Sequence, residues 1–461
     1  MPARVIVVGG GISGLALAAA LRDCGLDPVV LEGDSRLGGT VRTERAEGHL
    51  YETGPVGFLD REPATLARAE KLGLSDRLVR AKDSAHARWI WRRGRLWEAP
   101  TSPPKFLSSG LLSLRGRLRV AMEPFAGAPQ EGKDETVAEF GRRRIGEEGV
   151  RTLLDPMVSG VFGGDVDRLS MRSAFPRMVA LERDHGSLVR AMIRLGRERR
   201  RSGPLRGGSG GPTGPGGTLT SMPGGLTDVI DALGADLGDR VRPGARVQSI
   251  EPMGQGWKAV LSAGEDALGD AIVLAIPSFL QAALLRPLEP AASDALESIS
   301  YASMTLAILG FARADVRHDL AGFGFLAPRS DDLRALGAIC VSSVFDGRAP
   351  DGHVQIDVRI GGATDPRAID LPDDRMLAVA MDALGRALGI DAEPSFVRIV
   401  RHPRGIPQYE VGHADRVARA EEGAFRRRGL YLSGNALHGV GFNDCVREAE
   451  ALAERIVRER G

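Results

Sequence analysis

The chain reads Val5-Ile6-Val7-Val8-Gly9-Gly10-Gly11-Ile12-Ser13-Gly14 close to its N-terminus, and this stretch decides the fold. A β-branched run, glycines at G-x-G-x-x-G spacing and a following Ala- and Leu-rich run predict a strand, a phosphate-binding turn and a helix. In such a turn Gly9 permits the tight bend, Gly11 lets the backbone approach a pyrophosphate, and Gly14 lets the helix pack on the strand. The first N–H groups of the helix would then hold the anion.

A second predicted strand, Pro28-Val29-Val30-Leu31, ends at Glu32, close to the spacing expected for an acid that binds ribose hydroxyls. An acid repels a 2′-phosphate, so NADP is not expected here. The next segment, Arg36-Leu37-Gly38-Gly39-Thr40, is similar to the R-x-G-G element of amine-oxidase-like flavoproteins, and its position behind Glu32 favours FAD over a plain glycine turn. The predicted FAD contacts in this region are Gly9, Gly10, Gly11, Ile12, Ser13, Gly14, Glu32, Arg36, Gly38 and Gly39.

Length and composition restrict the class of protein. A chain of 461 residues is too long for one compact core, so two or three domains are expected. The charge balance of 61 basic against 60 acidic residues gives no attraction to nucleic acid, and no nucleic-acid partner is predicted. Three widely spaced cysteines indicate a reduced, cytoplasmic protein without disulfides. The eight histidines show no metal-ligand spacing, so no metal is predicted.

The order of patterns predicts an α/β fold with a discontinuous FAD-binding Rossmann-like domain, a mixed-sheet substrate domain and an inserted helical domain. The FAD-binding domain is predicted at 1–84, 219–285 and 423–461, the substrate domain at 85–98 and 286–422, and the helical domain at 99–218, ending in a mobile Gly-rich loop over 202–218. The expected elements include helices at 62–72, 374–388 and 443–458, a helix start at 221–226, strands near 245–250 and 257–276, and a hairpin at 88–97 broken at Gly94.

Several blocks, taken in order along the whole chain, resemble the oxygen-dependent protoporphyrinogen oxidases. Two of them, the N-terminal glycine motif and Ser221-Met222-Pro223-Gly224-Gly225-Leu226, occur in many flavin amine oxidases. A further block is Ser159-Gly160-Val161-Phe162-Gly163-Gly164-Asp165. The specific blocks are Gly405-Ile406-Pro407-Gln408-Tyr409 with Gly412-His413, and Gly439-Val440-Gly441-Phe442-Asn443-Asp444-Cys445.

This resemblance implies oxidation of protoporphyrinogen IX to protoporphyrin IX, the penultimate step of heme biosynthesis, or of its coproporphyrin analogue. Three two-electron steps would pass through FAD to dioxygen and yield peroxide, and no catalytic side chain is predicted because the flavin performs the redox step. The resemblance places Arg88 on a substrate propionate and implies further substrate contacts at Phe325, Leu326, Phe345 and Gly164. It implies further FAD contacts at Gly54, Pro55, Val56, Gly57, Val247, His402, Gly434, Asn435, Val440, Gly441 and Phe442.

Two positions depart from the family pattern and one segment bears on location. Val56 stands where many relatives have asparagine, and His402 where an aromatic residue is common. Residues 100–127 resemble the family's membrane-binding region because apolar and basic residues alternate there, although a helix packed on its own domain would look the same. The expected location is therefore cytoplasmic and peripheral on the inner face of the cell membrane. A monomer or a homodimer is expected, with the next enzyme of heme synthesis as a candidate partner.

Three alternatives stay open from the residues alone. A flavin amine oxidase typically has a lysine near the flavin from the second half of the chain, and this chain has no lysine after Lys258. A carotenoid-desaturase-like enzyme shares the glycine motifs but has a different C-terminal block. A non-catalytic flavin- or porphyrin-binding protein would release no peroxide in air when it is given a porphyrinogen.

Overall fold

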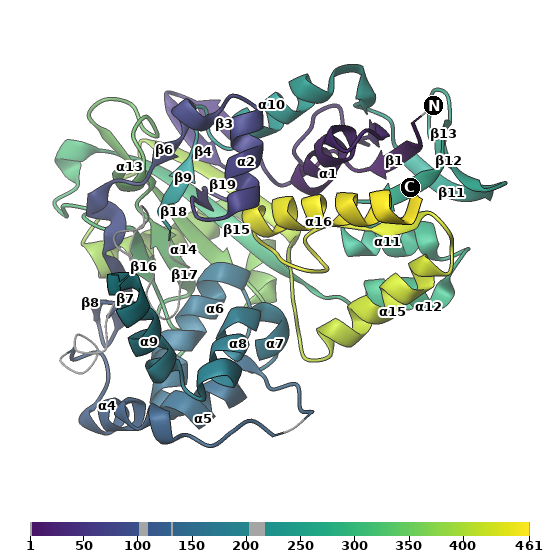
Figure 1. Cartoon of the computed structure of the whole chain (residues 1–461). Coiled ribbons are helices and arrows are strands. Elements are labelled where there is room, and N and C mark those ends of the chain that lie inside the picture. The colour runs from purple at the N-terminus through teal and green to yellow at the C-terminus, as the bar shows by residue number, and fades with distance from the viewer. Residues whose placement is uncertain (1, 101–108, 131, 202–216, 461) are drawn as a thin grey trace.

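The computed structural model describes residues 2–100, 109–130, 132–201 and 217–460 (Figure 1). Its first sheet is entirely parallel, in the order β10-β2-β1-β14-β20. These strands come from separate parts of the chain: β1 (Arg4–Val8), β2 (Asp27–Leu31), β10 (Val241–Arg242), β14 (Ala271–Leu274) and β20 (Leu430–Leu432). The sheet therefore closes only after the last strand has returned from beyond residue 400.

Helices and a small sheet cover the two faces of the parallel sheet. One face buries apolar side chains under α1 (Ile12–Asp23), α2 (Pro63–Lys71), α10 (Thr227–Leu237) and α16 (Phe442–Arg460). The other face packs on β11 (Val247–Met253), β12 (Gly256–Leu261), β13 (Ala267–Gly269), α11 (Ser278–Leu285), α12 (Pro290–Glu297) and α15 (His413–Phe425). Both faces are thus buried, which is usual for a parallel sheet and explains its continuous apolar strands.

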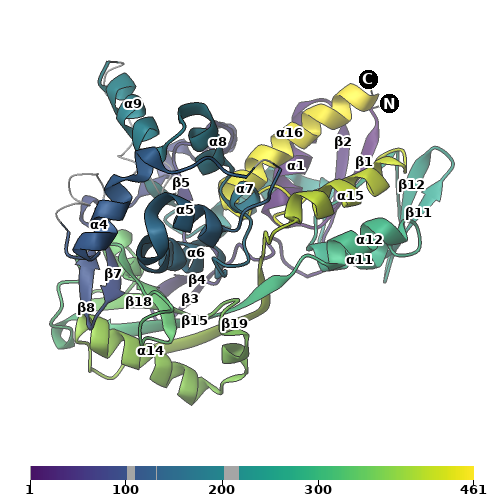
Figure 2. The same ribbon diagram turned by 90° about the horizontal axis from the view of Figure 1, so that it is seen from below.

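A second, mixed sheet has seven strands in the order β19-β15-β18-β17-β16-β7-β8. Their bounds are β7 (Arg88–Arg92), β8 (Arg95–Glu98), β15 (Tyr301–Ala312), β16 (Gly324–Leu326), β17 (Ala335–Ile339), β18 (His353–Gly361) and β19 (Phe396–Pro407). Helix α14 (Asp373–Leu388) covers one face (Figure 2). Because Trp91, Phe325 and Val358 belong to the core beneath α14, the alternate residues face the other way. We call that opposite side the inner face.

A helical segment lies against this inner face. It contains α4 (Leu114–Ala121), α5 (Val137–Gly149), α6 (Asp155–Phe162), α7 (Met171–Ala174), α8 (Pro176–His185) and α9 (Leu188–Arg201). Helix α6 contacts β16 and β17, while α5 and α6 lie across the sheet from α14 (Figure 2). The core of the helical segment includes Phe140 and Phe162. The fully buried Arg144 forms ion pairs there with Glu182 and Glu123.

Short elements connect these parts. They are β3 (Thr43–Ala46), β4 (His49–Glu52), β5 (Phe58–Leu59), β6 (Val79–Arg80), β9 (Leu219–Ser221) and α13 (Val341–Val344), with 3₁₀ turns at η1 (Ser75–Arg77), η2 (Asp83–His86), η3 (Glu123–Phe125), η5 (Gly238–Arg240), η6 (Arg313–Asp315) and η7 (Pro366–Asp370) and a π-helical turn at η4 (Val150–Leu154). Strand β4 is placed between the two sheets, because Leu50 N donates to the Arg348 carbonyl and His49 contacts Gln355 of β18.

Most of the expected elements are present with shifted ends. The expected helices at 62–72, 374–388 and 443–458 correspond to α2, α14 and α16, and the hairpin turns at Gly94, whose φ is +73°. The expected helix start at 221–226 is instead a turn, since α10 begins only at Thr227. The predicted Gly-rich loop lies outside the described residues over 202–216, as do residues 101–108 of the predicted membrane region.

Candidate active site

The N-terminal glycine turn has the geometry that its sequence predicts. Gly9 has a φ of +111°, and a Cβ there would lie 2.6 Å from the carbonyl oxygen of Ala275. A Cβ at Gly14 would lie only 1.9 Å from the carbonyl oxygen of Gly9, so the helix can approach the strand only without a side chain there. These two glycines are required by the fold itself.

Gly11 has a different role, because space lies open in front of it. A Cβ at Gly11 would meet nothing closer than the Gly38 oxygen at 3.9 Å, and one at Gly39 would meet only Gly11 Cα at 3.6 Å. The Gly38 N–H donates to the Gly10 carbonyl over 2.9 Å, which holds the two glycine segments side by side. The cradle between them, at the N-terminus of α1, fits the pyrophosphate of a dinucleotide.

Glu32 closes one end of this cradle. Its Oε2 accepts a hydrogen bond of 2.6 Å from Gly10 N, and its Oε1 accepts one of 2.8 Å from Asp34 N. The carboxylate is therefore fixed beside the predicted ribose position. Of the neighbouring predicted contacts, Arg36 is exposed at the rim, and Val247 begins β11 next to Arg246, which pairs with Asp34.

The loop of residues 53–57 connects the cradle to the inner face. A Cβ at Gly54 would lie 2.0 Å from the Thr40 carbonyl oxygen, so this loop and the second glycine segment are in direct contact. His402 Nε2 on β19 lies 2.6 Å from the Thr53 carbonyl oxygen, which ties one end of the loop to the mixed sheet. Val56 packs in an apolar cluster with the buried Phe345 at the other end. A flavin ring held by this loop would therefore lie next to the inner face.

The second loop near the cradle, residues 434–442, is braced by the G-I-P-Q-Y-x-x-G-H block. The Tyr409 hydroxyl donates to the Asn435 carbonyl over 2.6 Å and accepts from Gly439 N over 2.7 Å. The His413 ring stacks on Tyr409 with centroids 3.9 Å apart, and its Nε2 lies 3.0 Å from the Leu437 carbonyl oxygen. Burial lowers the pKa of His413 to about 4, so this imidazole is neutral at physiological pH.

Three other residues of the predicted site, Phe442, Val440 and Gly164, make contacts in or near this loop. Phe442 stacks on Phe58 of β5 at 5.4 Å, and Val440 packs against the core of the helical segment. Gly164 lies beside Gln408, whose Nε2 donates to the Phe162 carbonyl over 2.8 Å. The motif that carried most weight in the sequence thus joins the helical segment to the cofactor loop, and sequence patterns did not indicate that bracing role.

The predicted substrate residues lie on both sides of the mixed sheet. Leu326 lies on the inner face and contacts Gly160 of α6, whereas Phe325 points into the core beneath α14. Arg88 lies on the inner face at the start of β7, with its guanidinium 5.6 Å from the centre of the Phe323 ring. In the described part of the chain Arg88 has no side-chain hydrogen bond or ion pair, and the residue is exposed. Its charge is available to an acidic ligand.

Buried carboxyl groups accompany these residues. Burial raises the pKa of Asp357 on β18 to about 7, and Gln355 Nε2 donates to it over 3.2 Å. Burial likewise raises the pKa of Glu52 to about 7, although that side chain accepts hydrogen bonds from Leu226 N and Thr43. Neither group was indicated by the sequence pattern, because Glu52 and Asp357 are single acidic residues in the strands β4 and β18.

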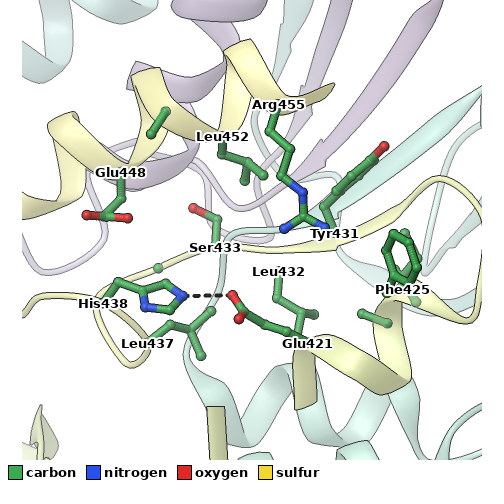
Figure 3. Close-up of a pocket in the computed structure, with 14 residues that line it drawn as sticks. Glu421, Phe425, Tyr431, Leu432, Ser433, Leu437, His438, Glu448, Leu452 and Arg455 are labelled. Carbon is green, nitrogen blue, oxygen red and sulfur yellow. Dashed lines mark hydrogen bonds and ion pairs between the residues drawn. The ribbon is translucent and has the colours of Figure 1, made fainter. Parts of the chain in front are cut away.

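A separate hollow of about 170 Å³ lies at the outer edge of the parallel sheet (Figure 3). Side chains of α15, β20 and α16 line it, and His438 Nε2 lies 2.7 Å from Glu421 Oε1 inside it. Glu421 raises the pKa of His438. The hollow runs along β20 as far as Gly434, and none of the residues of the glycine cradle at 9–14 and 38–39 line it.

A glycine cradle at the strand ends of a parallel sheet, beside a mixed sheet with an apolar and cationic inner face, defines the fold of FAD-dependent oxidoreductases. The chain belongs to the flavin containing amine oxidoreductase family, which it matches over residues 12–457. Members of this family bind FAD, and FAD is the cofactor of this protein.

Individual relatives match over nearly the whole chain. The protein is 34% identical to the chloroplastic protoporphyrinogen oxidase of Oryza sativa subsp. japonica, over 98% of this chain and 88% of the relative. It is 33% identical to the coproporphyrinogen III oxidase of Propionibacterium freudenreichii subsp. freudenreichii, over 98% of this chain and 90% of the relative. A solved structure from Exiguobacterium sp. 255-15, provisionally named a protoporphyrinogen oxidase, has a TM-score of 0.82 at 27% identity and covers 100% of this chain and 99% of its own.

Proposed function

We propose that the protein oxidises a porphyrinogen to the corresponding porphyrin, with FAD as the immediate acceptor and dioxygen as the final one. The observation that carries this proposal is Arg88, a cation with no side-chain hydrogen bond or ion pair among the described residues, on the sheet face next to the flavin loop. A guanidinium there suits a propionate, which it binds through two parallel hydrogen bonds. Relatives named for both porphyrinogens support the same substrate class.

The proposed reaction requires few chemical functions from the side chains. Bound FAD supplies the acceptor for the hydride equivalents that leave the macrocycle, so the side chains need only bind and orient the two partners. Loops 53–57 and 434–442 hold the cofactor, Arg88 fixes one edge of the substrate, and Leu326 with Phe345 supplies apolar surface.

Purified protein tests the proposal when it is incubated separately with protoporphyrinogen IX and coproporphyrinogen III. Porphyrin fluorescence and peroxide are followed together, because three two-electron steps predict three peroxides for each porphyrin formed. Porphyrin formation with that ratio from either substrate supports the proposal. If FAD-loaded protein forms no porphyrin from either substrate, the proposal is wrong, and primary amines then test the amine-oxidase alternative.

We also propose peripheral attachment to a membrane, through a different part of the segment than the sequence suggested. Leu111 and Leu112, expected at an interface, are buried and cannot reach a bilayer. An apolar stripe on α4 and η3 is exposed instead, and consists of Leu114 (72% exposed), Leu118 (67%), Met122 (58%) and Phe125 (80%). Spacings of four residues place Leu114, Leu118 and the C-cap residue Met122 on one face of α4, and Phe125 extends the stripe into η3. Within the described ranges, no helix is long and apolar enough to cross a membrane.

A further inference from the structure

Arg359 on β18 is the least satisfied charged side chain near the candidate site. It lies on the inner face, directly opposite Leu306 of β15 and Gly337 of β17. Its Nε is buried and has no hydrogen-bond partner, and no ion pair to the guanidinium exists in the described part of the chain. Burial of an arginine without a partner is costly, so such a residue usually serves a ligand that supplies the missing acceptor.

The side chains around Arg359 offer it no acceptor. Its register neighbour on β17 is Gly337, and Leu336, at the register shift beside Gly337, belongs to an apolar cluster. On its other side lies Leu306, part of an apolar cluster with Tyr51 and Met304. The nearby carboxyl, Asp357, forms no ion pair with Arg359 and is held by Gln355 instead. A protein carboxylate therefore does not already occupy the place of a substrate carboxylate.

The distance between Arg359 and Arg88 indicates the size of a ligand that could reach both. Both residues lie on the inner face, because Arg88 is level with Gly324, Ile339 and Asp357 across the sheet, and Asp357 is two residues from Arg359. Strands β17 and β16 separate β18 from β7, so three strand spacings of about 4.8 Å place the two backbones about 14 Å apart. This distance is comparable to the width of a tetrapyrrole together with its propionate side chains.

The flavin loop is close to both arginines. Glu52, immediately before that loop, interacts electrostatically with Asp357, and the loop is tied to β19 through His402. A flat substrate next to the flavin would therefore lie across the inner face, with one edge toward Arg88 and the other toward Arg359.

We propose that Arg359 binds a substrate carboxylate at the edge of the macrocycle opposite Arg88, so that the site selects a porphyrinogen with propionates on opposing edges. This inference rests on the proposed function. Coproporphyrinogen III has one propionate on each pyrrole, whereas protoporphyrinogen IX has two propionates on neighbouring pyrroles and vinyl groups on the other side. Arg359 therefore favours the tetracarboxylate substrate.

The test compares Arg359→Met and Arg359→Lys with Arg398→Met in the FAD-loaded enzyme. Arg398 is the matched control, because it lies on the inner side of β19 but already pairs with Glu47 over 2.7 Å. For Arg359→Met the KM for coproporphyrinogen III is expected to rise roughly ten- to hundredfold, the effect of losing a charge-assisted hydrogen bond. The KM for protoporphyrinogen IX should change less than about threefold, and Arg359→Lys should recover part of the loss.

Binding measured without turnover provides the second readout. Quenching of porphyrin fluorescence should show weaker binding of coproporphyrin III to Arg359→Met, with FAD content and flavin absorption unchanged. Equal loss for both porphyrins, no loss for either, or a changed flavin spectrum would overturn the assignment of Arg359 to an opposing propionate. These failures are distinct from failure of the proposed function, in which the unaltered enzyme itself oxidises neither porphyrinogen.

Discussion

Gly11 is the residue at which cofactor binding and folding can be separated. Its φ of −75° suits any residue, and the space before it is open, whereas Gly14 is in contact with the backbone of Gly9. Gly11→Val is therefore expected to fold but to place a side chain where the FAD pyrophosphate lies. Purified Gly11→Val should be colourless, with a melting temperature like that of the FAD-free parent protein.

Gly14→Ala provides the contrast to this variant. A Cβ 1.9 Å from the Gly9 oxygen should prevent α1 from packing on β1, so this protein is expected to be insoluble or strongly destabilised. A yellow Gly11→Val with one FAD per chain would show that the pyrophosphate does not occupy the cradle.

Asp357 should make stability depend on pH in a defined direction. Its pKa is raised from an ordinary 3.8 to about 7 by burial, so between these values the folded protein holds a proton that the unfolded chain releases. Stability therefore falls as pH rises toward 7, by up to about 1.4 kcal/mol per pH unit, and the dependence ends above the folded pKa. Asp357→Asn has no carboxyl group at this position, so its stability should lack this dependence on pH.

Melting temperatures at pH 5, 6, 7 and 8 test this assignment. The parent protein should lose stability relative to Asp357→Asn from pH 5 to 7, and the difference should level off between pH 7 and 8. Asp391→Asn, at an exposed position, serves as the control and should follow the parent at every pH. Parallel curves for Asp357→Asn and the parent would show that Asp357 is ionised throughout.

Arg359 and Asp357 also show what sequence patterns miss at this scale. The run Val354-Gln355-Ile356-Asp357-Val358-Arg359-Ile360 alternates perfectly, and such alternation normally indicates a strand with one solvated face. The polar face of β18 is not simply solvated, because His49 of β4, from a distant part of the chain, contacts Gln355 on it. A local pattern contains no information about that contact.

At the scale of elements, the sequence predicted the parts that depend on local periodicity. Helix α14 follows from apolar residues such as Met376, Ala380 and Leu384 at four-residue spacing, and the hairpin of β7 and β8 follows from Gly94. The bracing by the G-I-P-Q-Y-x-x-G-H block was not predictable, because its partners are backbone carbonyls and N–H groups some 25 to 30 residues away in the chain.

That bracing gives a prediction for loop 434–442. Tyr409→Phe removes the hydroxyl that joins Asn435 to Gly439 and leaves a buried carbonyl and N–H without a partner. The expected cost is about 1–3 kcal/mol of loop stability, seen as weaker FAD retention with the overall fold preserved. FAD release during dilution, followed by flavin fluorescence, measures the effect.

Tyr431→Phe is the matched control for this experiment. Its hydroxyl donates to Glu459 on α16, away from the loop, so FAD retention should be unchanged in that variant. Equal FAD release from both variants and the parent would show that the Tyr409 hydroxyl does not hold the cofactor loop.

At the scale of the whole molecule, the two sheets collect strands from distant segments, and chain order alone could not specify their neighbours. The parallel sheet joins β1, β14 and β20 although more than 150 residues separate β14 from β20. The order of predicted strands and helices along the chain supplied the expectation of a discontinuous cofactor domain, but it did not give the order of the strands within either sheet. The domain limits given from the sequence remain our proposal for how these parts divide.

The exposed apolar stripe is a property of the whole molecule, since α4 lies at the end far from both termini (Figures 1 and 2). Burying large apolar side chains in a bilayer interface stabilises attachment by about 1.5–3 kcal/mol each. The double variant Leu118→Glu, Phe125→Glu is therefore expected to lower vesicle binding at least about tenfold. Co-sedimentation with phosphatidylcholine vesicles, with and without phosphatidylglycerol, measures the change.

Phe425→Glu separates this effect from a general loss of surface hydrophobicity. Phe425 is 68% exposed, comparable with Phe125, but it ends α15 on the cofactor side of the molecule. Vesicle binding of this control should equal that of the parent protein. All three proteins should oxidise dissolved porphyrinogen at the same rate, because none of the substituted side chains is among the predicted cofactor or substrate contacts. If the double variant and the parent bind vesicles equally, α4 does not contact a membrane, and the stripe must be covered by another molecule instead.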